Sequence, residues 1–393
     1  MTVVIYFVIM LLNLYLFITK RKVKVVDVAT FAFFAVTFLG NIRSGESDIG
    51  RYRLHYLNRT SAIDSTFWHV EKGYGRLADY CSGLGIPFPL FLLVIFLVCS
   101  FLIFSLLDEF HCNYSVFFFL YGCFYYFFTL EVLRFYIALA ILLFGIKLLL
   151  DNRLIQFLIC ILVATLFHKS FIVYLIFLIV PYRKITNKFY IAFMALMLLI
   201  VCVVFINGNR IPFYGDIYAM IFGGWKSNLY VDQKTHLGWI PYVLYYVFTV
   251  ILVLFANRII SLAEVENQKE YKRLRDYETL CIRCLALVSF SLPLTMLRVD
   301  YFRIFFAVSL MSFILLAAVF GECITDENIK VTEDVPTQYF KPKGLHWNNL
   351  YVVEITFGVI AVMLVWSFIW WKLSLNNISL IGALKENIFF QPF

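Results

Sequence analysis

The chain has 393 residues, of which 62% are hydrophobic and only 15% are charged, with a formal net charge of +8. A soluble domain is about half apolar and a quarter charged, so this composition excludes an ordinary soluble enzyme. Apolar runs of about 20 residues recur along the chain, which is typical of a polytopic helical membrane protein. No P-loop or GxGxxG motif is present, and we expect no nucleic-acid partner.

In chain order, the apolar runs predict an all-α integral membrane protein with about twelve transmembrane helices. The first run precedes Lys20-Arg21-Lys22 rather than a small-residue cleavage site, so we expect it to be a retained helix and not a signal peptide. The predicted segments are 3–19, 25–40, 87–107, 114–130, 135–150, 154–167, 170–181, 189–206, 239–257, 278–297, 302–320 and 350–371.

Basic residues in short loops predict the orientation, because such loops stay in the cytoplasm. They gather at residues 20–24, near 185 and in the loop 258–276, and all three agree if the N-terminus lies outside. We therefore expect one transmembrane domain over residues 1–393. Its cytoplasmic loops are 258–276 and 321–349, and its outward loops are 41–86 and 207–238.

The stretch from Leu133 to Ser170 is predicted to form a helical hairpin with Asp151-Asn152-Arg153 as its turn. Arg134 and His168 then meet at the opposite end. A single helix over 154–180 would place His168 and Lys169 near the middle of the bilayer, which is costly. We therefore predict two short helices that meet at His168.

Arginine is unusually frequent on the predicted outward side, where a bacterial membrane protein normally has few basic residues. A guanidinium binds phosphate through a planar fork of donors and stays charged, so this excess indicates a diphosphate-bearing lipid substrate. The alternative is that these side chains only reach toward lipid headgroups. The outward arginines are Arg43, Arg51, Arg53, Arg59, Arg76, Arg134, Arg210, Arg298 and Arg303.

Three short patterns resemble one known family. Arg134 heads an Ala-rich helix, a polar turn follows, and the next helix ends in Phe167-His168-Lys169-Ser170. Upstream lie the segments 47–56 and 71–75, and downstream lies 298–303. Over roughly residues 40 to 305 the chain resembles the EpsG/Wzy type of bacterial polysaccharide polymerase. The tight Asp-Tyr pair common in that family is here spread to Asp48 and Tyr52.

The resemblance implies a GT-C-like membrane glycosyltransferase of the bacterial inner membrane, with its catalytic face on the periplasmic, outer side. Its substrates would be undecaprenyl-diphosphate-linked oligosaccharide repeats, joined into O-antigen, capsule or exopolysaccharide. We also expect the lipid bilayer and a chain-length regulator protein as partners, and no cofactor. We expect no metal, because the spacing of His, Asp and Glu shows no recognisable ligand set. A polysaccharide flippase and another membrane transferase, such as an O-antigen ligase or an acyltransferase, remain alternatives.

His168, Arg134 and Glu71 are the candidate catalytic residues. His168 has an ordinary pKa near working pH, so it could remove a proton from an acceptor hydroxyl; it could equally donate a hydrogen bond or be a plain turn residue. Ser170 is predicted to be a helix cap, and Asp300 to orient the arginines on either side of it. The candidate substrate-binding residues are Arg298, Arg303, Asp48, Arg51, Tyr52 and Arg76.

Overall fold

The computed structural model of the protein describes residues 2–19, 22–42, 47–58, 71–180, 187–211, 237–261, 263–265, 268–322 and 340–342. The described residues are almost entirely helical. Two short strands, β1 (Ala263–Val265) and β2 (Phe340–Pro342), pair antiparallel. The predicted span 350–371 lies outside the described residues, as does most of the predicted loops 207–238 and 321–349.

The first half of the chain contains two early helices, a helical pair in the predicted loop 41–86, and a second group that ends in the predicted hairpin. They are α1 (Thr2–Thr19), α2 (Lys24–Leu39), α3 (Asp48–Asn58), α5 (Lys72–Gly83), α6 (Phe88–Glu109), α7 (Tyr114–Phe124), α8 (Tyr126–Glu131), α9 (Leu133–Leu150) and α10 (Leu154–Phe167).

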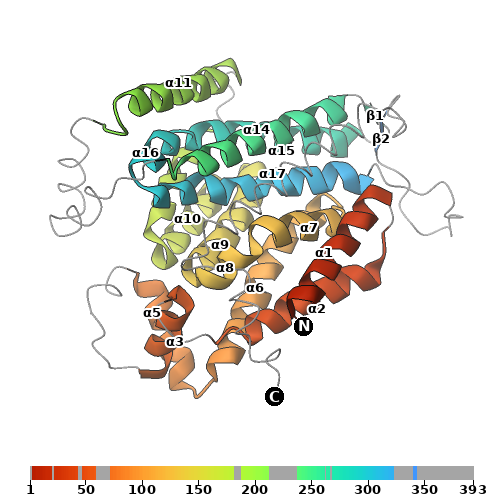
Figure 1. Cartoon of the computed structure of the whole chain (residues 1–393). Coiled ribbons are helices and arrows are strands. Elements are labelled where there is room, and N and C mark those ends of the chain that lie inside the picture. The colour runs from red at the N-terminus through yellow and green to blue at the C-terminus, as the bar shows by residue number, and fades with distance from the viewer. Residues whose placement is uncertain are drawn as a thin grey trace, which may run out of the picture.

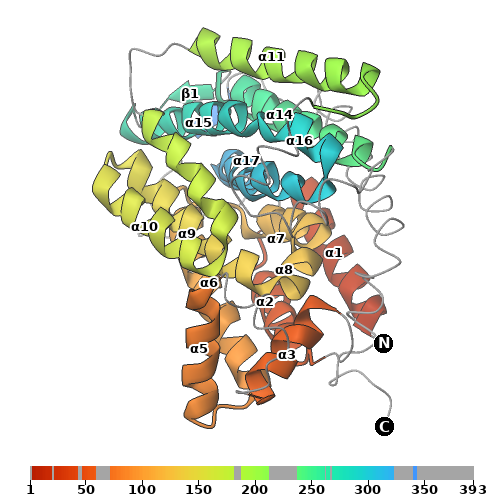
Figure 2. The ribbon, with the colours of Figure 1, turned by 90° about the vertical axis from the view of Figure 1, so that its left-hand side faces the viewer.

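The second half begins with a 3₁₀ helix, and another short 3₁₀ turn precedes its last helix. The elements are η1 (Lys169–Ile179), α11 (Asn187–Ile206), α14 (Ile240–Ser261), α15 (Gln268–Val288), α16 (Ser291–Leu297), η2 (Val299–Tyr301) and α17 (Phe302–Glu322). In both views α11 lies along one edge of the bundle, and α3 and α5 lie together at another (Figures 1 and 2).

Five of the described helices, α6, α9, α11, α14 and α17, are long and apolar enough to cross a membrane, and the bent pair α15–α16 adds a sixth span. Four other apolar helices, α1, α7, α10 and η1, are shorter. The prediction of a polytopic helical membrane protein is therefore confirmed. The sequence predicted about twelve spans, whereas helix length and hydropathy identify five or six in the described part of the chain.

Two predicted segments differ from the structure. The segment 114–130 is broken at Tyr125, which separates α7 from α8 and packs against Phe306 of α17 with ring centroids 4.2 Å apart. The segment 278–297 belongs to a helix that starts at Gln268 and bends by 40° before α16. Its first turns were missed because they are amphipathic, with charged residues between the buried Leu274 and Tyr277.

The core is centred on α17, which packs against α7, α14 and α15. Every residue from Ile304 to Phe320 is buried, as expected for a helix that is apolar on all sides. In contrast, α6, α10 and α11 expose large apolar side chains such as Phe101, Ile155 and Leu199. These exposed faces are suited to contact with lipid, because the surface of a soluble protein rarely carries such a large apolar area.

The bundle has two ends, which we name the Arg134 end and the Asp151 end after the two extremes of α9. At the Arg134 end, α3 packs against α5 and α6, and the ring of Tyr242 of α14 lies tilted against that of Phe302 of α17. At the Asp151 end, the N–H of Asn113 donates to the carbonyl of Ala317, 2.9 Å away. The segments predicted to face outward that the structure describes lie mainly at the Arg134 end.

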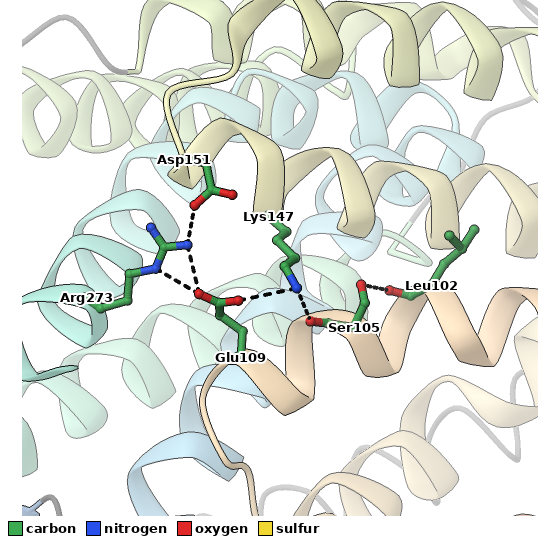
Figure 3. Close-up of polar contacts among 6 residues, drawn as sticks. All are labelled: Leu102, Ser105, Glu109, Lys147, Asp151 and Arg273. Atoms are coloured by element: carbon green, nitrogen blue, oxygen red, sulfur yellow. Dashed lines mark hydrogen bonds and ion pairs between the residues drawn. The ribbon is translucent and has the colours of Figure 1, made fainter.

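Four charged side chains join three helices at the Asp151 end (Figure 3). Arg273 of α15 donates to Glu109 of α6 at 2.9 and 3.1 Å and also contacts Asp151 after α9. Lys147 of α9 lies 3.3 Å from Glu109 and donates to the carbonyl of Ser105 at 2.8 Å. We call Glu109, Lys147, Asp151 and Arg273 the Arg273 network. Two cations and two acids balance each other within it.

Candidate functional site

The hairpin predicted from Leu133 to Ser170 is present. Helices α9 and α10 pack side by side, and the turn between them contains Asn152 with a φ of 59°. Asparagine tolerates this left-handed conformation better than most residues, so the polar turn suits a sharp reversal. The reversal brings the start of α9 and the end of α10 to the same end of the bundle. Arg134 and His168 are therefore neighbours, as predicted.

His168 is the single extended residue between α10 and η1, with φ −150° and ψ 108°. Two short helices thus meet at this histidine, which confirms the prediction. Its Nδ1 lies 2.7 Å from the hydroxyl of Ser170. The ring meets Phe135 and Phe171 edge-on, with centroids 5.8 and 5.7 Å away. Ser170, predicted to cap a helix, instead fixes one nitrogen of the imidazole.

Arg134 is held by two side chains from the helical pair in the loop 41–86. Its Nη1 lies 2.5 Å from Oε2 of Glu71, and its Nε donates to the hydroxyl of Tyr52 at 3.0 Å. The other carboxylate oxygen of Glu71 accepts the backbone N–H of Lys169 at 3.2 Å. Glu71 and Arg134 are mostly buried, with 8% and 14% of their side chains exposed. Glu71 therefore connects the start of α9 to the residue after His168.

Gly73 allows α5 to come this close to α10. A Cβ atom at Gly73 would lie 2.7 Å from the carbonyl oxygen of Leu166, a distance that real side chains do not tolerate. Without a side chain here, the backbone of α5 packs directly on the last turn of α10. This contact places Glu71, two residues earlier, beside Lys169. The neighbouring Gly75 has open space around its position.

A second group of arginines lies at the start of α17. Arg298 donates to Asp300 at 2.6 Å, and Arg303 lies 3.4 Å from the other oxygen of the same carboxylate. The prediction that Asp300 orients both guanidiniums is confirmed. Arg303 also lies over the ring of Phe128, 5.7 Å from its centroid. Its Nε is buried and makes no hydrogen bond with the described residues.

The electrostatics connect these groups into one site. Burial, together with the charges of Arg303 and Arg134, holds the pKa of His168 well below its ordinary value of 6.5. Burial raises the pKa of Glu71 despite the opposing charges of Arg134 and Arg303. We call Tyr52, Glu71, Arg134, His168 and Arg303 the Arg134 cluster. At neutral pH its histidine is uncharged, which is the form that accepts a proton.

The remaining predicted binding residues are on α3 and α5. Asp48 begins α3 and is close enough for its charge to act on Tyr52, whose pKa burial raises to about 12. Arg51 and Arg76 have exposed side chains and are not part of the Arg134 cluster. The structure therefore brings together Tyr52, Glu71, Arg134, His168 and Arg303, with Arg298 and Asp48 beside them.

This arrangement can bind an anion and accept a proton within one site. Arg298 and Arg303 present planar donors suited to phosphate oxygens, and His168 provides an uncharged imidazole with one nitrogen already engaged by Ser170. Among the described residues, no three His, Cys, Asp or Glu side chains are grouped so that they could hold a metal ion. The sequence did not reveal the Glu71–Arg134 pair, because 62 residues lie between the two partners.

Comparison with known proteins agrees with the resemblance seen in the motifs. The model of the EpsG family matches residues 24–332, which is most of the chain. No curated protein and no solved structure matched. The chain belongs to the EpsG family. It is thus a multi-pass membrane protein of a family linked to exopolysaccharide biosynthesis.

Proposed function

We propose that this protein is a repeat-unit polymerase that joins undecaprenyl-diphosphate-linked oligosaccharides into a polysaccharide. Membership of the EpsG family supports the pathway. The observation that carries the proposal is the Arg134 cluster: an uncharged histidine and arginines converge at one end of a membrane bundle. Glycosyl transfer from a lipid-linked diphosphate needs an anion site for the leaving group and a base for the proton of the acceptor hydroxyl.

The reaction requires one bond to form and one to break. A hydroxyl at the non-reducing end of a lipid-linked repeat attacks the anomeric carbon of the growing glycan. The bond from that carbon to the diphosphate breaks, and undecaprenyl diphosphate leaves with the electron pair. The hydroxyl proton passes to a base. We propose a GT-C-like site that faces the outer side of the inner membrane, where the lipid-linked repeats are presented.

His168 is the proposed base. Its depressed pKa keeps it uncharged at neutral pH, and its side chain is partly exposed, unlike that of Glu71. If Nδ1–H donates to the hydroxyl of Ser170, then Nε2 carries the lone pair that accepts the proton.

Arg298 and Arg303 are proposed to bind the departing diphosphate, whose charge develops as the bond breaks. Arg134 is held by Glu71 and Tyr52. We propose that it stabilises the negative charge of the diphosphate and also holds the surrounding side chains in position. Asp48, Arg51 and Arg76 remain proposed contacts for the sugar chain or its diphosphate.

Purified protein in nanodiscs tests the proposal directly. With lipid-linked repeat units as the only substrate, we expect a ladder of products that differ by one repeat, together with free undecaprenyl diphosphate. An Arg303→Ala variant should lose both product formation and binding of the lipid-linked repeat. Transfer only to a different acceptor would indicate a ligase instead. Movement of the lipid across the bilayer without elongation would indicate a flippase.

The membrane orientation has a separate test. Cysteines introduced at the exposed positions Lys169 and Lys272 lie at opposite ends of the bundle. In a background whose native cysteines are replaced by serine, an impermeant thiol reagent should label Lys169→Cys in intact spheroplasts. Lys272→Cys should be labelled only after the membrane is opened. The reverse pattern would place the Arg134 cluster in the cytoplasm and contradict the proposal.

A further inference from the structure

A polar cavity lies at the Asp151 end, among the ends of α9 and η1 and one face of α15. Its volume is about 200 Å³, and Leu149 and Leu150 form part of its wall. A single ordered water needs roughly 15 Å³ of such space, so the cavity has room for a much larger group. Leu150 is about 24 Å from Arg134 along the axis of α9, so the cavity is separate from the Arg134 cluster.

One face of α15 supplies the charged groups of this cavity, and Asn152 of the α9–α10 turn adds a polar side chain. Asp276, Thr279, Leu280 and Arg283 all line it and follow one another at helical spacing. Asp276 is exposed, whereas Arg283, two turns or about 10 Å further along the helix, is half-buried. The cavity thus has an exposed acidic group at its outer rim and a half-buried guanidinium on its wall.

Arg283 is fixed in place by its neighbours. Its Nη1 donates to the carbonyl of Val180 at 2.7 Å, just after η1 ends. Its guanidinium lies over Tyr190 of α11, 5.3 Å from the ring centroid. An arginine within a membrane-spanning helix is costly and commonly marks a binding site. Here it is held at the wall of a cavity that can receive a negatively charged group.

We propose that this cavity binds the headgroup of a zwitterionic aminophospholipid such as phosphatidylethanolamine. In that lipid the ammonium lies nearest the water, the phosphate lies deeper, and the acyl chains follow. Asp276 at the rim matches the ammonium, and Arg283 matches the phosphate. Leu149, Leu150 and Leu280 provide an apolar wall for the glycerol and the first chain carbons.

The charge order in the cavity discriminates between lipids. A headgroup with a net negative charge, such as phosphatidylglycerol, would bring its glycerol rather than a cation to Asp276. Its hydroxyls would donate only neutral hydrogen bonds to the carboxylate, which are weaker than the charge-assisted contact of an ammonium, and its net negative charge would be repelled by Asp276. A soluble phosphate ester with an amine has the same polar chemistry, but it lacks the acyl chains that fit the apolar wall. This site is independent of the proposed polymerase activity.

Native mass spectrometry of the full-length protein tests the site. The protein is released from vesicles of equimolar phosphatidylethanolamine and phosphatidylglycerol, and the lipids that remain bound are counted. We expect phosphatidylethanolamine to be retained with a preference of about tenfold, the scale of one charge-assisted hydrogen bond. Soluble phosphoethanolamine at millimolar concentration should displace little of it. Complete displacement would assign the cavity to a soluble phosphate ester and overturn the lipid assignment.

Two variants separate the charges, and a third is the control. Asp276→Asn should abolish the preference between the two lipids without loss of folding, because Asp276 is exposed. Arg283→Gln should reduce retention of phosphatidylethanolamine about tenfold. Arg258→Gln removes an exposed arginine at the end of α14, away from the cavity lining, and should change nothing. An unchanged lipid preference in Asp276→Asn, or equal retention of both lipids by the wild type, would refute the proposal.

Discussion

The two ends of the α9–α10 hairpin are both held by charged side chains, but the two arrangements differ. The Arg273 network pairs two cations with two acids, each about a quarter exposed. At the Arg134 end, Arg134, Arg298, Arg303 and Lys169 face Glu71, Asp300 and Asp48 beside an uncharged histidine. A balanced network stabilises the fold. An excess of cations around a neutral imidazole favours an anionic ligand instead.

His168→Ala should produce the largest effect, since it removes the proposed base. We expect product formation to fall by about 10²- to 10⁴-fold, the usual contribution of general base catalysis. Binding of the lipid-linked repeat should survive, because accepting a proton adds little to ground-state affinity. Both are measured in nanodiscs after expression of the variant is checked. Loss of binding equal to that of Arg303→Ala would make His168 part of the anion site.

Arg134→Lys should come next, with a loss of about 10- to 100-fold in product formation. Arg134 uses two different nitrogens for Glu71 and Tyr52, and a single ammonium cannot reproduce that planar geometry. Glu71 would then keep an incompletely paired buried charge, so the melting temperature should also fall. A normal polysaccharide ladder from this variant in a strain lacking the gene would show that Arg134 contributes only its charge.

Gly73→Ala tests how the Arg134 end is assembled. The added methyl group would clash with the carbonyl of Leu166 and push α5 away from α10. Glu71 would then move from the N–H of Lys169, and we expect a loss of activity on the order of tenfold. Gly75→Ala is the matched control, because its Cβ meets nothing within 4 Å. Equal activities of the two variants would argue against Gly73 as the contact that sets the site.

Acidification should weaken the Arg134 end through His168. The folded pKa of this histidine lies well below 6.5, so between the two pKa values the unfolded chain binds more protons. The contribution of neutral His168 to the free energy of unfolding is therefore complete above pH 6.5. It is lost as the pH falls, by up to about 1.4 kcal/mol per pH unit. Thermal unfolding of the wild type and of His168→Gln, compared from pH 7.5 to 5, measures this. Parallel curves would contradict the stated pKa direction.

Arg273→Ala should have the smallest effect on chemistry. Its ion pairs are partly exposed, so we expect a loss of about 1 kcal/mol in stability, with the rate of polymer formation unchanged. The readouts are the melting temperature and the polymerisation rate of the same preparation. A large fall in the rate at unchanged stability would show that the two ends of the hairpin are coupled.

Much of the hairpin was predictable from sequence, because a charged side chain inside the bilayer raises the free energy and therefore marks where helices end. The polar residues Asp151–Arg153 themselves indicated the turn. The cost of placing His168 and Lys169 near the middle of the bilayer, together with the orientation of the later basic loops, indicated the break. The partner of Arg134 was not predictable, since it depends on Gly73 packing against Leu166 from a distant part of the chain. The early start of α15 was missed because hydropathy hides an amphipathic helix.

The 3₁₀ geometry of η1 has a consequence for chain length. Eleven residues rise about 22 Å at 2.0 Å each, whereas an α-helix of the same length would rise only about 16 Å. The buried side chains Phe171, Tyr174 and Phe177 recur every third residue, as a helix with three residues per turn requires. A one-residue insertion here would rotate this column by about 120°. Deletions and insertions in this segment should therefore be tolerated only in steps of three.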